Sequence, residues 1–301
     1  MASIYHYTSG ASLLGIVNAG EFWATDIGFL NDHKEHSLGY EEAQRYLKSL
    51  EGGESKPVIG DVLKQLYRLV MDSSERNIIT RPTYVVSFAK KPDSIAHWFS
   101  YCEKNQGYCI EFEEDCFLNQ GGANEALFEF FEDVIYEDVE AFRKKLSERM
   151  SEDSIIEMFR EAHRTAELKG IDVQGEGDAK TEAFLEAVGT EVLRNAMGQL
   201  IISCSSYKEE GFIHESERRL VLVQKNLSAR QVGQLPVMKF REKNGVIFPY
   251  VSMQFNRKSI KRIIVGPCSD FSLKEAGLLK LLNHHGLECK IEPSSSSLRF
   301  T

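Results

Sequence analysis

Two carboxylates close together in the sequence are the first residues whose spacing could support chemistry. Glu215 and Glu217 open an apolar stretch that reads as a strand over 215–224. Side chains of a strand alternate between its two faces, so this strand would place both carboxylates on one face. Like charges that close raise the pKa of at least one group, and we expect a positive partner or a ligand beside them. The alternative is a solvated strand end neutralised by Arg218, Arg219 or Lys208.

A second group of candidate residues lies at the start of the chain, in Tyr5-His6-Tyr7-Thr8. In a strand, His6 and Thr8 would share one face, and the two tyrosines the other. A histidine and a threonine that project together can hydrogen-bond ribose hydroxyls or a phosphate, and aromatic neighbours can stack on a planar ring. The alternative is a core strand with one satisfied histidine.

A third group is the polar stretch from Asn31 to His36. Asp32, Glu35 and His36 offer the mixed carboxylate and imidazole ligands that several divalent ions accept. The spacing matches no known zinc motif. We favour a helix start instead, with Asp32 as the N-cap and Glu35 three residues further on, as in a capping box.

Aromatic residues form the fourth group, on a short helix that Pro92-Asp93-Ser94 should begin. Trp98 and Tyr101 are three residues apart and therefore share a helix face. Core packing is the better interpretation for Trp98, whereas Tyr101 could wall a pocket.

The elements that position these residues indicate an α+β protein. Ser9 is a candidate N-cap, and Gly20 a candidate C-terminal stop, for a helix between two early strands. We expect a single domain over 1–301, with a helical insertion over about 113–200. The sequence predicts strands at 3–8, 21–24, 84–88, 107–112, 201–207, 215–224, 248–255, 262–266 and 287–291, and helices at 38–50, 57–76, 123–168, 178–200 and 272–283.

Composition excludes several classes of protein. Hydrophobic residues make up 42% and charged residues 27% of the 301 residues, as in a globular protein. The sequence contains no membrane-length apolar run and no signal-peptide pattern, so we expect a cytoplasmic protein without a membrane partner. It also lacks a phosphate-binding Walker loop, a dinucleotide-binding glycine motif and a serine-hydrolase elbow. The net charge is −9, and the basic residues cluster only at Arg257-Lys258 with Lys261-Arg262, a candidate polyanion contact.

The motifs together resemble an uncharacterised, mostly bacterial family of domains of unknown function. The resemblance rests on the order of Tyr5 to Thr8, Asn31-Asp32 with Glu35, Ser87-Phe88, Trp98 with Tyr101, Gly107 with Ile110 and Phe112, Glu215-x-Glu217-x-Arg219, and Ile263 to Pro267. It extends over nearly the whole chain outside the helical insertion.

More distantly, the opening strand and the late Glu-x-Glu strand resemble those of ADP-ribosyltransferases. That resemblance implies a fold of split antiparallel β-sheets around a cleft that holds NAD as substrate, with no metal. His6 would then bind the adenosine ribose with support from Thr8, and Tyr101 or Tyr7 would stack on nicotinamide. Glu217 would stabilise the oxocarbenium ion, and Glu215 would orient the acceptor.

We therefore hypothesise an NAD-dependent ADP-ribosyltransferase, a toxin or phage-defence effector that modifies nucleic acid or protein. Two alternatives stay open. One is a metal-dependent nuclease or phosphodiesterase that uses Asp32, Glu35, His36 and Glu217. The other is a non-catalytic module that binds a ligand in the same cleft.

Overall fold

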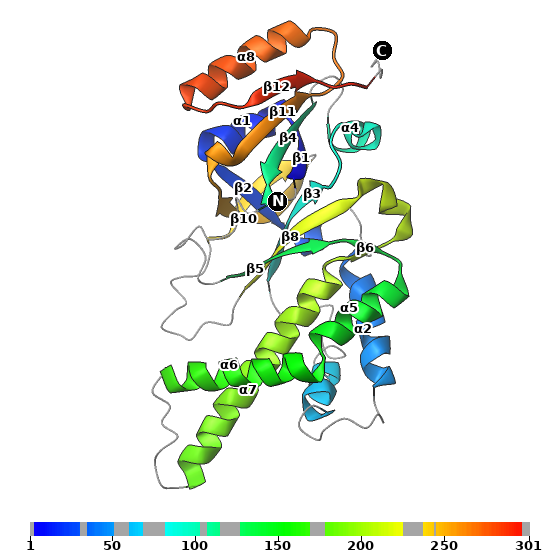
Figure 1. Cartoon of the computed structure of the whole chain (residues 1–301), viewed down its shortest axis with the longest axis vertical. Coiled ribbons are helices and arrows are strands. Elements are labelled where there is room, and N and C mark those ends of the chain that lie inside the picture. Colours follow the sequence, from blue (N-terminus) through cyan, green and yellow to red (C-terminus); the bar gives the residue numbers. More distant parts are fainter. Residues whose placement is uncertain are drawn as a thin grey trace. The chain divides into compact units, whose positions relative to one another are not determined.

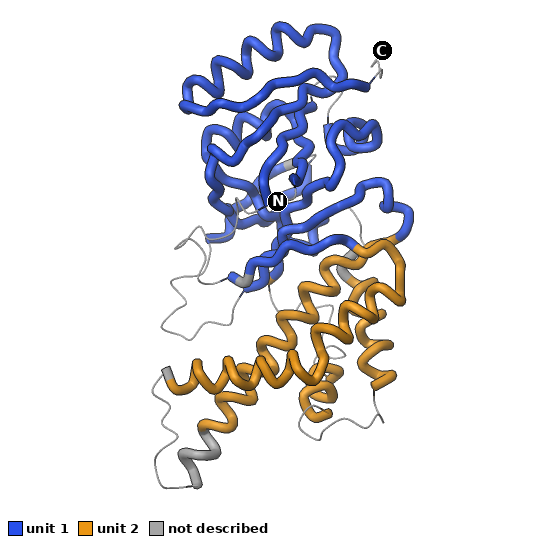
Figure 2. Tube along the Cα trace, viewed as in Figure 1, with its two compact units in different colours: residues 1–30, 83–134, 210–301 blue, residues 31–82, 135–209 orange. Residues whose placement is uncertain are grey.

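The chain folds into two compact units, each built from separate stretches of sequence (Figure 2). The computed structural model describes residues 3–30, 35–50, 60–68, 82–102, 107–114, 127–168, 178–224, 237–243 and 245–296. Unit 1 comprises Met1–Leu30, Thr83–Val134 and Glu210–Thr301, and unit 2 comprises Asn31–Pro82 and Ile135–Glu209. The expectation of a single domain stays a prediction.

Unit 1 is organised by one large mixed sheet (Figure 1). Its strands are β1 (Ser3–Ser9), β2 (Glu21–Asp26), β3 (Thr83–Ala89), β4 (Gly107–Glu113), β5 (Leu127–Asp133), β8 (Glu217–Gln224), β9 (Lys239–Lys243), β10 (Val246–Gln254), β11 (Ile260–Val265) and β12 (Lys290–Pro293). The order is β12-β11-β4-β1-β3-β2-β10-β9, and β8 pairs with both β3 and β5. All these pairings are antiparallel except β11 with β12.

The sheet divides at β3. One edge of β3 pairs with β8 along its whole length, and the other edge is shared by two strands. Tyr5 of β1 lies opposite Ala89 at the end of β3, whereas Thr25 of β2 lies opposite Val85 near its start. The two strands β1 and β2 thus diverge along one edge of β3. Ser87 lies between the two paired positions of β3, and its carbonyl accepts a hydrogen bond from His6 Nδ1 at 3.1 Å.

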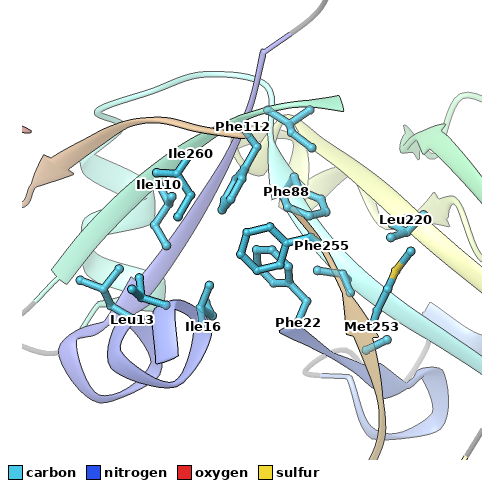
Figure 3. Close-up of a cluster of buried hydrophobic side chains, with 14 of the residues drawn as sticks. Leu13, Ile16, Phe22, Phe88, Ile110, Phe112, Leu220, Met253, Phe255 and Ile260 are labelled. Atoms are coloured by element: carbon cyan, nitrogen blue, oxygen red, sulfur yellow. The ribbon is translucent and has the colours of Figure 1, made fainter. Parts of the chain in front are cut away.

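Each face of this sheet has its own apolar cluster. The larger cluster packs Phe22, Phe88, Phe112 and Phe255 together (Figure 3), with ring centroids 5.0 to 6.5 Å apart. Helices α1 (Gly10–Ala19) and α8 (Phe271–His284) add Leu13, Ile16, Val17, Leu278 and Leu282 to it. The smaller cluster, on the other face, joins Tyr5, Tyr7, Ala89, Cys109 and Ile264 to Trp98 of helix α4 (Ile95–Tyr101).

Local signals for the first helix were predictive. The Ser9 side chain accepts a hydrogen bond from the Ser12 backbone N–H, and Gly20 ends α1 with φ of 66°, a left-handed conformation that suits glycine. The caps expected for α1 are therefore confirmed. Short 3-10 turns complete unit 1 at η1 (Ile27–Phe29), η3 (Glu210–Glu215) and η5 (Arg257–Ser259).

Unit 2 is largely helical. It contains α2 (Glu35–Ser49), helical turns at 60–68, α5 (Val139–Arg149), α6 (Glu152–Leu168), α7 (Asp178–Cys204) and a short parallel pair of β6 (Ile135–Tyr136) with β7 (Tyr207–Lys208). Gly39 allows α2 to approach α7 closely, because a Cβ there would lie 2.4 Å from the Cys204 carbonyl oxygen. No helix in the described ranges is long and apolar enough to cross a membrane.

The expected α+β class is confirmed, but two predicted elements were wrong. The strand predicted at 201–207 is mostly helix, because α7 continues to Cys204. Every residue from Leu200 to Cys204 is buried, and a continuous buried run does not distinguish a strand from a helix. The helix predicted over 123–168 contains β5 instead at Leu127–Asp133. Its aromatic residues pair with β8, and tertiary pairing outweighs helix propensity there.

Candidate active site

A buried carboxylate and arginine anchor the site on β8. Glu217 and Arg219 share one face of the strand, and Glu217 lies opposite Ala89 of the smaller apolar cluster. The guanidinium donates from Nε to Oε1 at 2.7 Å and from Nη2 to Oε2 at 2.9 Å. Both side chains are almost fully buried. This two-point contact fixes the orientation of the Glu217 carboxylate.

Glu215 reaches the site by a different route from the one predicted. It is the last residue of η3, and the strand begins only at Glu217. Ser216 between them has φ of 43°, and its carbonyl accepts from the Lys90 backbone N–H at 2.9 Å. Simple strand alternation across Glu215 and Glu217 was therefore wrong, because the left-handed Ser216 interrupts it.

Glu215 is nevertheless held beside the predicted aromatic residue. Tyr101 of α4 donates from its hydroxyl to Glu215 Oε1 at 2.5 Å. Glu215 is buried, whereas 37% of Tyr101 is exposed. A phenol that donates to a carboxylate forms a strong, charge-assisted hydrogen bond that fixes both groups. The site thus combines an exposed aromatic ring with a buried acid.

His97 joins this group through helical spacing, four residues before Tyr101. The centroids of these two rings are 5.8 Å apart, and the other side of His97 stacks on Tyr7 at 4.5 Å. Burial lowers the pKa of His97, although its hydrogen bond with the Glu215 backbone and the charge of Glu215 oppose that shift. Its Nδ1 is buried without a hydrogen-bond partner among the described residues. The imidazole is therefore neutral at physiological pH.

Tyr7 is a support for α4 in the structure. Its hydroxyl donates to the Lys91 carbonyl at 3.2 Å and accepts from the Ser94 backbone N–H at 2.8 Å. Because the side chain is buried and both contacts fix the turn before α4, Tyr7 positions His97. Asp93 fixes the same turn, since it accepts from Trp98 Nε1 at 2.9 Å and from the Ser295 backbone N–H at 2.6 Å.

His6 and Thr8 lie on the opposite face of the sheet from Glu217. The His6 ring packs edge-on against Phe22 and Phe88 of the larger apolar cluster, with centroids 5.0 and 5.7 Å away. Burial lowers its pKa to about 4; the hydrogen bond to Ser87 opposes the shift, and the charge of Arg241 adds to it. Thr8 is buried. The structure therefore brings Tyr7, Tyr101, Glu215 and Glu217 together, but not His6 or Thr8.

The side chains of the candidate metal ligands in the third group lie outside the described part of the chain. Asn31 and Asp32 lie outside the described residues, as do the side chains of Glu35 and His36 at the start of α2. Within the described ranges, no three His, Cys, Asp or Glu side chains are grouped to hold a metal ion.

The basic cluster is largely engaged with acidic neighbours or the backbone. Lys261 pairs with Glu113 at 2.6 Å, and Arg262 pairs with both Glu111 and Glu292 at 2.6 and 2.7 Å. Arg257 donates to the Asn18 carbonyl at 2.6 Å. These contacts disfavour the cluster as a polyanion surface.

Sequence reasoning missed His97 and gave Arg219 only a neutralising role. The spacing of each residue from a predicted site residue could have indicated its place in the site. His97 is four residues from Tyr101 and therefore shares its helix face, and Arg219 is two residues from Glu217 and shares its strand face.

The fold and this site define an α+β protein with an aromatic and carboxylate cluster on one face of a divided sheet. A family model described as "Protein of unknown function (DUF2971)" matches residues 97–220. The match includes most of α4, all of η3 and the start of β8, and also the helices that the sequence suggested were an insertion. No curated protein and no solved structure matches the chain.

Proposed function

We propose that the chain is an NAD-dependent ADP-ribosyltransferase, with its reaction centre at Tyr101, Glu215 and Glu217. The observation that carries the proposal is the Tyr101–Glu215 hydrogen bond next to the Arg219-bound carboxylate of Glu217. An exposed aromatic ring beside fixed carboxylates suits a planar nicotinamide ring attached to a ribose.

The chemistry assigns a separate role to each acid. When the C1–N bond of the nicotinamide ribose breaks, nicotinamide keeps the bonding electrons, and positive charge develops on the ribose. Glu217 stabilises that charge, because Arg219 holds its carboxylate in one orientation before the reaction. Glu215, held by Tyr101, orients the acceptor. The acceptor's oxygen or nitrogen forms the new bond to C1 and gives its proton to the Glu215 carboxylate.

The proposal does not depend on His6 or Thr8. The distant resemblance assigns them to the adenosine ribose, but they lie on the face opposite Glu217. Tyr7 likewise supports α4 through its hydroxyl, so Tyr101 is our candidate for stacking on nicotinamide.

The test is an assay of labelled NAD with single-stranded DNA, duplex DNA, RNA or protein as acceptor. We expect nicotinamide release and label transfer that Glu217→Gln reduces at least a hundredfold, whereas the exposed control Glu288→Gln retains wild-type rates. Transfer lost in Glu215→Gln while nicotinamide release continues would confirm an acceptor role for Glu215. Wild-type protein that neither binds NAD nor releases nicotinamide with any acceptor would refute the proposal.

The two alternative hypotheses make different predictions in the same assay. A metal-dependent nuclease would cleave nucleic acid only with a divalent ion and would stop on addition of EDTA. A sensing module would bind a ligand without turnover, and equilibrium dialysis with labelled NAD would test NAD as that ligand.

A further inference from the structure

A second polar feature lies at the other end of the sheet, on β9. Arg241 is surrounded by three aromatic rings from β2 and β10. Its guanidinium carbon lies 5.7 Å from the Trp23 ring centroid and 5.9 Å from those of Phe248 and Tyr250. Cross-strand pairing explains the cluster, since Phe248 faces Arg241 and Tyr250 faces Thr25. The rings leave the guanidinium partly shielded from water.

Among the described residues, most N–H donors of Arg241 have no hydrogen-bond partner. Among the described residues its one hydrogen bond runs from Nη2 to Thr25 Oγ1, at 2.7 Å, and no carboxylate there forms an ion pair with it. Its Nε is buried and has no partner in the same part of the chain. Desolvation by burial lowers the pKa of Arg241, and Tyr250 opposes the shift. A guanidinium carries five N–H donors in a planar fork that matches phosphate.

The aromatic residue at the rim is both exposed and fixed. Trp23 is 38% exposed, and its Nε1 donates to Glu21 Oε1 at 3.3 Å. Glu21 is itself held by Ser252 and Gln254, at 3.0 Å each, and by Lys239. Phe29, 42% exposed, extends the apolar surface beyond Phe248, with ring centroids 6.3 Å apart. An oriented indole beside a guanidinium can accept a second planar ring.

We propose that this cluster binds a nucleotide, with its phosphate on Arg241 and its base stacked on Trp23. Two observations point to the ligand class. Arg241 has donors that no described residue pairs, and these suit an anion; the exposed rings beside it suit a planar apolar group. A nucleotide supplies both within one small molecule. The inference does not rest on the proposed function, because none of its residues belongs to the Tyr101 and Glu215 site.

Tryptophan fluorescence offers a direct test with adenosine monophosphate as the probe. The chain has two tryptophans, and Trp98 is buried with 1% exposure, so quenching by a stacked base reports on Trp23. We expect saturable quenching by adenosine monophosphate, and at least tenfold weaker binding of adenosine, which lacks the phosphate. Inorganic phosphate should compete without quenching.

Two pairs of variants separate binding from folding. Arg241→Met keeps the apolar stem and should weaken binding at least tenfold, whereas Arg241→Lys keeps the charge and should weaken it less. Trp23→Ala should abolish the binding measured by calorimetry, and Trp23→Phe should retain it. Failure of adenosine monophosphate to bind the wild-type protein, or equal binding by Arg241→Met, would overturn the proposal. If Arg241→Met does not fold, the comparison of Trp23→Ala with Trp23→Phe decides.

Discussion

The phenol of Tyr101 and the carboxylate of Glu215 are 2.5 Å apart although 114 residues separate them in the sequence. This hydrogen bond links α4 to η3 and holds the Tyr101 ring beside Glu215. Both partners fall within residues 97–220, which the DUF2971 family model matches. The contact therefore offers the most direct point at which to perturb the candidate site without disturbing the core.

Removing the Tyr101 hydroxyl should lower both the reaction rate and the stability of the fold. Under the proposed function, Tyr101→Phe should lower the rate of label transfer about tenfold, since a hydrogen bond to a charged group is worth about 1.5–3 kcal/mol. The buried Glu215 carboxylate loses this donor, so the free energy of unfolding should also fall, by about 1–3 kcal/mol. Steady-state transfer assays and urea unfolding measure the two effects. A transfer rate equal to that of the wild type would remove Tyr101 from the site.

Breaking the buried pair from one side should destabilise the protein strongly. Arg219→Met leaves the buried Glu217 carboxylate without its two-point partner, and we expect a loss of about 3 kcal/mol in the free energy of unfolding. The double variant with Glu217→Gln should lose less than the sum of the two single losses, because it leaves no buried carboxylate. Urea unfolding of all four proteins gives the coupling energy. Additive losses would show that the two side chains do not act as a pair.

Acidification should destabilise the fold through His6. Its folded-state pKa, about 4, lies below the ordinary value of 6.5, so the unfolded chain takes up the proton first. The destabilisation caused by His6 is absent above pH 6.5. The free energy of unfolding falls as the pH drops from 6.5 towards 4. Because the side chain is only partly buried, we expect a loss of about 1–2 kcal/mol. Unfolding at pH 7.5 and 5.0 should show a smaller difference in His6→Asn than in the wild type.

Two glycines should respond in opposite directions to the same substitution. Gly39→Ala would force a Cβ to within 2.4 Å of the Cys204 backbone, so α2 and α7 must separate, at a cost of about 2–3 kcal/mol. Gly15→Ala, in α1, meets nothing within 4 Å and should stabilise its helix by about 0.5–1 kcal/mol. Thermal unfolding compares the pair. A neutral Gly39→Ala would mean that the two helices adjust at little cost.

Short-range signals predicted the first part of unit 1 well. Ser9 and Gly20 set the ends of α1 through their own side chain and backbone, and apolar alternation set most of the neighbouring strands. Features that depend on distant partners were not predictable. Serine rarely adopts a positive φ, so the local sequence does not predict this conformation at Ser216, and it decides how Glu215 reaches Tyr101. Alternation in the sequence shows which residues of β1 share a face. The face of the sheet on which Glu217 lies depends instead on the register of β8 with β3, where Glu217 is opposite Ala89.

The position of β1 in the sheet has a consequence for how the chain acquires its structure during synthesis. The first strand is an interior strand, paired with β4 along its length and with β3 at Tyr5. A ribosome must therefore add more than a hundred residues before Ile4 can meet Phe112, and β8 completes the edge of β3 only after Gln224. Pairings this distant make folding slow. The nascent chain should thus keep its first strand unpaired for much of translation.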